Sequence, residues 1–328
     1  MNAVRPLWSL LKGTTKTAGT VAATVAGGWL GYSALAIEHD APLPPAVEAE
    51  RRTFTTAGVD PVSYYVDRSQ EGRPLVLVHS INAAASAFEM KPLFEHYRRE
   101  RPVYAIDLPG YGFTDRRDRV YSPPLFVDTL RAFLQSEVGV PADLVALSLG
   151  SEFAATVALT EGESVRSLAL LSPTGFGEPR SIAPDTSEKI RTAVNFPLWG
   201  QAIFDLLVTR RSINYYLGKN FAGAPNDEMI DYAYATAHQP GARNAPYYFI
   251  SGQLFTWDIR ERIYEQLNTP TLVLYDKDPN ISFALLPAAV ERNPNLRMLR
   301  VGPSCGLPHW EKLEETVQAL DDFWTDVG

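Results

Sequence analysis

The chain has 328 residues, 45% of them hydrophobic and 21% charged, with a formal net charge of -8. A chain of this length and composition can bury one large core, or a core and a smaller domain. The negative charge disfavours nucleic acid as a partner, because binding a phosphate backbone calls for a clustered basic face. The single cysteine, Cys305, excludes an intramolecular disulfide and a cluster of thiolate ligands for zinc.

The first 40 residues differ in composition from the remainder. Three basic residues precede an uncharged stretch at 17–37 that is rich in Gly, Ala and Thr, and acidic residues follow it. As a helix this stretch would span about 30 Å, the thickness of a bilayer core. We expect a membrane anchor, with the folded domain on the non-cytoplasmic side because the basic residues come first. The alternatives are a signal peptide cleaved near Ala34-Leu35-Ala36 and a disordered or surface-lying cytoplasmic tail.

Strand and helix patterns alternate after a proline-rich linker at 41–51. Apolar strand patterns occur at 54–58, 61–67, 73–80, 101–106, 144–147, 165–172, 270–276 and 296–302. Helical patterns lie at 87–100, 125–139, 150–159 and 311–324. Strands separated by helices predict an α/β fold, in which helices cover both faces of a mostly parallel sheet.

The strand patterns stop between Gly177 and Asn268. The pattern of this block predicts several helices rich in Phe, Tyr and Trp. We interpret the block as a helical cap inserted between two strands. Most of these aromatic residues are expected to pack in the core of the cap, but together they favour an apolar cleft for a small ligand. The predicted organisation is an N-terminal segment (1–40), a linker (41–51), a sheet domain (52–176 and 268–328) and the cap (177–267).

The stretch LVALSLGSEFAATVAL, residues 144–159, begins as an apolar strand pattern, passes through one serine and continues as an alanine-rich helical pattern. A tight turn between the two would lift the Ser148 hydroxyl above the carboxyl edge of the sheet. It would also aim the Leu149 N–H at a developing oxyanion. Such a turn crowds the residues two positions to either side, which here are the small Ala146 and Gly150. The alternative interpretation is a packed serine without a chemical role.

With Ala in place of the first Gly, this pentapeptide resembles the G-x-S-x-G nucleophile elbow of the α/β-hydrolase family. The resemblance covers residues 52–176 and 268–328, and it includes DLPGYGFTD at 107–115, a loop that the family often carries after its fourth strand. It implies a serine-nucleophile enzyme with a helical cap. A serine argues against the dehalogenase and epoxide hydrolase branches, which use an aspartate at this position.

The resemblance also implies the partners of the serine. The family's catalytic histidine lies in the loop before the final helix, where this chain has His309; a structural loop histidine is the alternative. The acid loop is matched by PTLVLYDKDPN, where Asp278 takes the position of the acid. Asp276 competes with it, because the loop is one residue short. The chain order Ser148, Asp278, His309 is the family's order.

One departure from the family lies in the loop that supplies oxyanion donors. The family carries His-Gly where this chain has His79 and Ser80. We expect the backbone N–H of Ile81 to join that of Leu149 as the oxyanion hole, with the side chain of Asn82 or Ser80 as an auxiliary donor.

The implied reaction is the hydrolysis of a small, apolar, ester-like substrate through an acyl-enzyme. No metal or organic cofactor is implied. The same triad also serves acyl transfer to an alcohol, cofactor-free peroxidation and C–C bond hydrolysis. A non-catalytic binding module on the same fold is a further alternative, although such modules commonly lose a member of the triad.

Overall fold

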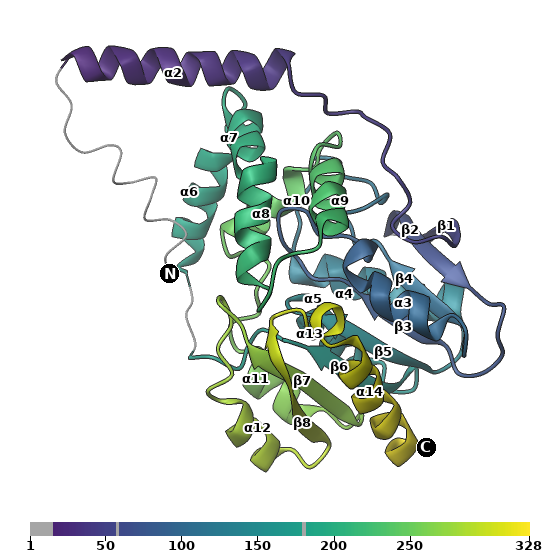
Figure 1. Ribbon diagram of the computed structural model, residues 1–328. Helices are drawn as coiled ribbons and strands as arrows, with labels where there is room; N and C mark the ends of the chain where they lie inside the picture. Colours follow the sequence, from purple (N-terminus) through teal and green to yellow (C-terminus); the bar gives the residue numbers. More distant parts are fainter. Residues whose placement is uncertain (1–15, 57–58, 179–181) are drawn as a thin grey trace.

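The computed structural model describes residues 16–56, 59–178 and 182–328 (Figure 1). Two of the three basic residues that precede the uncharged stretch lie outside these ranges. The eight strands of the described chain are β1 (Glu50–Thr56), β2 (Val59–Asp67), β3 (Leu75–Val78), β4 (Val103–Ile106), β5 (Ala142–Leu147), β6 (Val165–Leu171), β7 (Thr271–Lys277) and β8 (Leu296–Cys305). They form one sheet in the order β1-β2-β4-β3-β5-β6-β7-β8.

The sheet is mostly parallel, as the sequence predicts. Only the pairs β1–β2 and β2–β4 are antiparallel, and every pair from β4 to β8 is parallel. β5 lies between β3 and β6, and all six of its residues are buried. A fully buried strand reads as a continuous apolar run rather than an alternation, which is the pattern of residues 142–147.

Helices cover both faces of the sheet. The core helices are η1 (Ala87–Met90), α3 (Lys91–Tyr97), α4 (Pro123–Phe133), η2 (Leu134–Val138), α5 (Gly150–Thr160), α12 (Leu286–Arg292), α13 (Pro308–Glu311) and α14 (Leu313–Val327). One apolar cluster contains Phe94 of α3 and Leu320 of α14, and a second contains Phe126 of α4 and Phe153 of α5. The two clusters lie on opposite faces of the sheet (Figure 1). The predicted fold class is therefore confirmed, whereas α12 had not been predicted from the sequence.

The segment between β6 and β7 is helical. Its helices are α6 (Pro184–Val194), α7 (Gly200–Leu207), α8 (Arg210–Lys219), α9 (Asp227–Ala237), α10 (Asn244–Ile250), α11 (Ile259–Arg262) and η3 (Tyr264–Gln266). Helices α6 to α10 stand beyond one edge of the sheet (Figure 1). A separate apolar cluster, which includes Phe204 of α7, Ile213 of α8 and Tyr247 of α10, gives this segment its own core. The boundaries of the proposed domains stay a prediction.

Helix α2 (Lys16–Leu35) lies across the cap rather than on the sheet (Figure 1). Its indole donor, Trp29 Nε1, binds the Ala202 carbonyl of α7 at 2.7 Å. The Ser33 hydroxyl donates to Asp205 Oδ2 at 2.5 Å, and His39 Nε2 lies 2.9 Å from Asp205 Oδ1. Asp205 is fully buried, so these contacts enclose a carboxylate between the N-terminal segment and α7.

The structure does not support the expectation of a membrane-spanning anchor at residues 17–37. Within the described part of the chain, no helix has both the length and the apolarity that a bilayer crossing requires. Helix α2 has 20 residues, but its many Gly, Ala and Thr residues supply little hydrophobic free energy for insertion.

Candidate active site

Ser148 occupies a sharp turn between β5 and α5. Its φ is 51°, in the left-handed region that residues other than glycine seldom adopt. The turn is fixed because Ser148 N–H donates to the Leu171 carbonyl of the neighbouring strand at 2.9 Å. Strain of this kind persists only where the surroundings impose it, and it is concentrated at functional sites. The predicted strand-to-helix corner at Ser148 therefore agrees with the local geometry.

Gly150 allows the candidate oxyanion loop (residues 79–84, after β3) to approach this turn. A Cβ atom at position 150 would lie 2.3 Å from the His79 carbonyl oxygen, so no larger side chain fits without a shift of the main chain. The loop after β3 is thereby held against the first turn of α5. Among the described residues, the N–H groups of Leu149 and Ile81 have no hydrogen-bond acceptor, so both are free to bind an oxyanion.

The two aspartates of the acid loop have different partners. Asp276 accepts hydrogen bonds from Arg300 Nε at 2.5 Å and from Ser304 N–H at 2.9 Å. Burial raises the pKa of Asp276, but these two hydrogen bonds outweigh it and hold the pKa below its ordinary value. Asp276 thus forms a structural ion pair with Arg300.

Asp278 faces the loop that carries the candidate base. Its Oδ1 accepts from the N–H groups of Asn280 and Ile281 at 2.7 and 2.8 Å. Its Oδ2 lies beside Gly306, where a Cβ atom would come within 2.8 Å, and Gly306 has a φ of 93° that favours glycine. Burial raises the pKa of Asp278 above its ordinary value, although the two N–H donors oppose this. The geometry favours Asp278 over Asp276 as the acid.

His309 is fully buried at the start of α13. Its Nε2–H donates to the Glu89 carbonyl at 2.7 Å, and its Nδ1 has no partner among the described residues. Burial lowers the pKa of His309 to about 4, so the imidazole is neutral at neutral pH, as a general base must be.

The structure brings the three candidates to one edge of the sheet but does not join them. Ser148 follows β5, Asp278 follows β7 and His309 follows β8, and these strands are parallel. No hydrogen bond links any two of these three described residues in this arrangement. Because Nε2 carries a hydrogen bound to the Glu89 carbonyl, His309 must turn and this hydrogen must move to Nδ1 before Nε2 can accept a proton from Ser148.

Two residues near this edge had not been singled out from the sequence. Ser172 follows β6 with a φ of 44°, is fully buried and has a hydroxyl without a partner among the described residues. Glu89 binds the expected auxiliary donors, since its carboxylate accepts from both Ser80 and Asn82. Neither side chain is therefore free to serve an oxyanion directly. An acidic residue inside the apolar run AFEM was the one sequence signal for Glu89.

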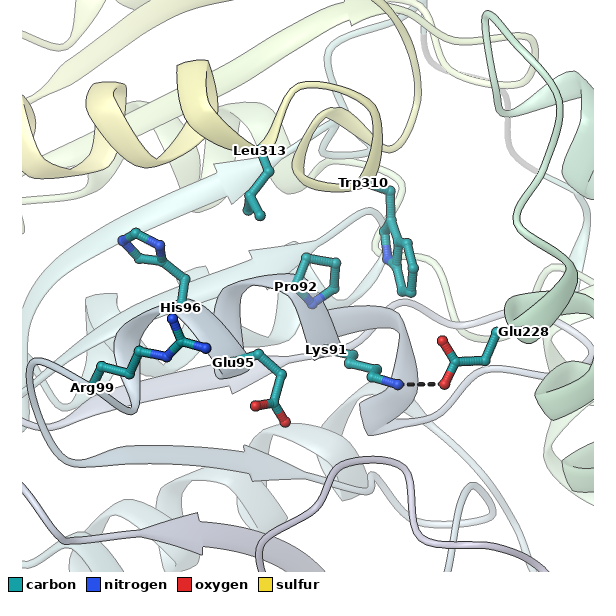
Figure 2. A pocket seen from close by; sticks show the side chains of 8 residues that line it. All are labelled: Lys91, Pro92, Glu95, His96, Arg99, Glu228, Trp310 and Leu313. Carbon is teal, nitrogen blue, oxygen red and sulfur yellow. Dashed lines mark hydrogen bonds and ion pairs between the residues drawn. The ribbon is translucent and has the colours of Figure 1, made fainter.

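A surface pocket lies next to this region but is not lined by the three candidates. Figure 2 shows this pocket, of about 340 Å³, between α3, α9 and the start of α14. Lys91 of α3 and Glu228 of α9 form an ion pair across it (Figure 2). Trp310, which follows His309, forms part of its wall, and its indole N–H donates to the Glu89 carbonyl at 2.7 Å. The ion pair thus connects the cap to the sheet domain beside the candidate base.

Comparison with known proteins matches the chain to a family model and to several hydrolases. A family model described as the alpha/beta hydrolase family matches residues 75–319. The pimeloyl-[acyl-carrier protein] methyl ester esterase of Aeromonas salmonicida is 25% identical over 266 residues, which cover 78% of this chain and 98% of the relative. The 2-hydroxymuconate semialdehyde hydrolase of Pseudomonas sp. (strain CF600) is 23% identical over 256 residues, which cover 76% and 85%.

Solved structures give the same fold. The CarC serine hydrolase involved in carbazole degradation aligns with a TM-score of 0.68 at 18% identity, covering 84% of this chain and 98% of that chain. A thermophilic esterase from Thermogutta terrifontis aligns with a TM-score of 0.65 at 20% identity, covering 85% and 99%.

Proposed function

Because the chain belongs to the alpha/beta hydrolase family, we propose that it is a serine hydrolase that cleaves an ester-like bond of a small, apolar substrate through an acyl-enzyme. The observation that carries the proposal is the left-handed Ser148 at the end of a fully buried central strand. That turn presents a hydroxyl at the carboxyl edge of the sheet beside the free N–H of Leu149. The esterase named among the relatives supports this class of reaction.

In the proposed mechanism, Ser148 attacks the carbonyl carbon while His309 takes its proton, and Asp278 stabilises the resulting imidazolium. The N–H groups of Leu149 and Ile81 bind the oxyanion. Loss of one such donor costs about 3 to 4 kcal/mol of barrier in well-studied serine hydrolases. His309 then gives the proton to the oxygen of the leaving alcohol, which departs as the acyl-enzyme forms. Water, activated by His309, resolves the acyl-enzyme.

The base must first leave the arrangement described above. A half-turn of the His309 ring about its Cβ–Cγ bond exchanges Nε2 with Cε1 and Nδ1 with Cδ2. The Glu89 carbonyl then receives the weaker Cε1–H contact. The ring hydrogen must also move from Nε2 to Nδ1, so that Nδ1–H can donate to Asp278 and Nε2 can accept the Ser148 proton. The partnerless Nδ1 supports this movement, since a buried nitrogen without a hydrogen bond costs about 1 to 3 kcal/mol.

A fluorophosphonate probe tests the nucleophile. The wild-type protein should be labelled once, and Ser148→Ala should abolish labelling with a change in unfolding free energy within about 1 kcal/mol. Labelling that survives the substitution would refute the assignment. A panel of p-nitrophenyl esters of increasing chain length would then define the acyl group.

C–C bond hydrolysis is the second candidate. Relatives named 2-hydroxymuconate semialdehyde hydrolase and 2-hydroxy-6-oxo-2,4-heptadienoate hydrolase favour it. Turnover of 2-hydroxy-6-oxo-2,4-heptadienoate that exceeds turnover of every ester in the panel would replace the ester proposal with this one.

We also propose that residues 17–37 hold the protein at a membrane surface without crossing it. The stretch carries no charge, and Tyr32 and Leu35 of α2 are 55% and 90% exposed. Cleavage near Ala36 would remove Trp29 and Ser33, which bind α7, so we favour retention of the segment over a cleaved signal.

Cell fractionation with a carbonate wash tests this proposal, because a surface-bound helix should be released by the wash as full-length protein. Protease treatment of intact cells then reports on which side of the membrane the domain lies. Full-length protein found only in the soluble cytoplasmic fraction would refute membrane association.

A further inference from the structure

The oxyanion loop is held by one carboxylate that lies nine residues further along the chain. Glu89 Oε2 accepts from Ser80 N–H at 2.8 Å, and Oε1 accepts from the Ser80 hydroxyl at 3.0 Å and from Asn82 Nδ2 at 2.6 Å. Asn82 in turn accepts from Ala84 N–H at 2.8 Å. The loop from residue 80 to residue 84 is thus tied to Glu89 through three donors.

The residue between these two fixed positions is Ile81, the expected second oxyanion donor. The Ser80 carbonyl belongs to the same peptide unit as the Ile81 N–H, and it accepts from His79 Nδ1 at 2.5 Å. In a trans peptide the carbonyl and the N–H point in opposite directions. Fixing the carbonyl on the His79 side therefore directs the Ile81 N–H to the other side of the loop.

His79 is itself held in a single protonation form. Its Nε2 accepts from Leu108 N–H at 2.9 Å, which leaves the hydrogen on Nδ1 for the Ser80 carbonyl. Burial lowers the pKa of His79 to about 4, so the ring remains neutral at neutral pH. The orientation of the Ser80–Ile81 peptide thus depends on His79 from one side and on Glu89 from the other.

Resting on the hydrolase function proposed above, we propose that Glu89 is a positioning residue of the oxyanion hole. By binding Ser80 and Asn82 on either side of Ile81, its carboxylate holds the Ile81 N–H in the orientation that a tetrahedral intermediate requires. The main-chain carbonyl of Glu89 also accepts hydrogen bonds from His309 Nε2–H and Trp310 Nε1–H. One residue therefore links the donor loop to the loop of the base.

Glu89→Gln replaces the carboxylate that holds the loop by an amide, with little change in side-chain volume. The amide offers one acceptor oxygen, and its NH₂ group would face N–H donors of Ser80 or Asn82, so at least one contact is lost. We expect kcat for a p-nitrophenyl ester to fall 10- to 100-fold with KM within about threefold, short of the 10²- to 10³-fold expected for complete loss of a donor. The matched control is Glu95→Gln, which removes a partly exposed carboxylate of α3 that pairs with Arg98 just beyond the helix and should leave kcat within twofold.

Amide hydrogen exchange separates positioning from a general structural role. In Glu89→Gln, exchange should rise in the segment 79–86 and stay unchanged in β5. A folded Glu89→Gln protein whose kcat is within threefold of wild type would overturn the proposal, as would exchange that rises across the whole sheet. If this variant does not fold, Asn82→Ala replaces it, with an expected 3- to 10-fold loss of kcat at constant KM. An unchanged kcat in Asn82→Ala would equally overturn the proposal.

The two proposals fail in different ways. A wild-type protein that neither reacts with the fluorophosphonate nor hydrolyses any ester refutes the hydrolase function. The exchange measurement would still decide whether Glu89 holds the loop. A labelled and active wild type with an unaffected Glu89→Gln variant refutes only the role of Glu89.

Discussion

Asp278→Asn should nearly abolish turnover while leaving the acid loop folded. The asparagine oxygen can still accept from the N–H groups of Asn280 and Ile281, which now lie 2.7 and 2.8 Å from Asp278 Oδ1. What changes is Oδ2, which becomes an NH₂ donor on the side that faces Gly306 and the loop of His309. Loss of the carboxylate that supports the imidazolium costs about 10⁴ in turnover, or about 5 kcal/mol of barrier.

Asp276→Asn should have the opposite consequence. It removes the charge that pairs with Arg300 and weakens the bond from Ser304 N–H. Hydrogen bonds to charged groups contribute about 1.5 to 3 kcal/mol, and the lower end applies because the Arg300 side chain is 64% exposed and solvent screens the pair. We expect a lower Tm by a few degrees and kcat within a few fold of wild type.

The two variants form a matched pair, because each converts one carboxylate of the same loop into an amide. Turnover of a p-nitrophenyl ester and urea unfolding at pH 7 should be measured for both. The expected pattern is an inactive, stable Asp278→Asn protein and an active, less stable Asp276→Asn protein. The reverse ranking of activity would show that Asp276 is the acid and that the shortened loop shifts the register by two residues.

Three further changes have distinct expected results. Gly150→Ala places a methyl group against the His79 carbonyl and should lower the fluorophosphonate labelling rate by more than tenfold; an unchanged rate would contradict the close approach of the oxyanion loop. Burial raises the pKa of Glu152 to about 7 against the opposing bonds from Thr174 and Thr256. The folded protein therefore binds a proton that the unfolded chain releases near pH 4.5, so stability falls as pH rises from about 4.5 to 7. Glu152→Gln should remove this fall in urea titrations at pH 5 and 8, and a slope that persists would assign it elsewhere. Asp205→Ala should release α2 from the cap, so that limited proteolysis near residues 36–45 becomes faster while the Tm of the core is retained; equal cleavage rates would refute this coupling.

The sequence predicted the sheet well because each buried strand is a local apolar run. The run at 142–147 is buried along its whole length, and the serine that follows it takes the strained turn expected of a strand-to-helix corner. Patterns of this kind depend on neighbours within a few residues. They survive folding because tertiary contacts reinforce them.

What the sequence could not supply are contacts between distant residues. Asp276 and Asp278 look alike in the sequence, and only their partners in the structure, among them Arg300 and Ser304 for Asp276, separate a structural carboxylate from a candidate acid. The contact between Ser33 and Asp205 joins residues 172 positions apart. The interpretation of residues 17–37 rested on length, composition and charge, none of which can indicate that the segment binds the cap.

The candidate residues lie beside strands that differ in how readily they open locally, because these strands hold different places in the sheet order. Ser148 ends a central strand that has neighbours on both sides, whereas His309 follows β8, an edge strand whose side chains are mostly exposed. Edge elements open in subglobal events that leave the centre intact. Mild denaturant would therefore displace His309 while Ser148 keeps its strained turn. Turnover should then fall at a lower denaturant concentration than the one at which the fluorescence of the buried core changes.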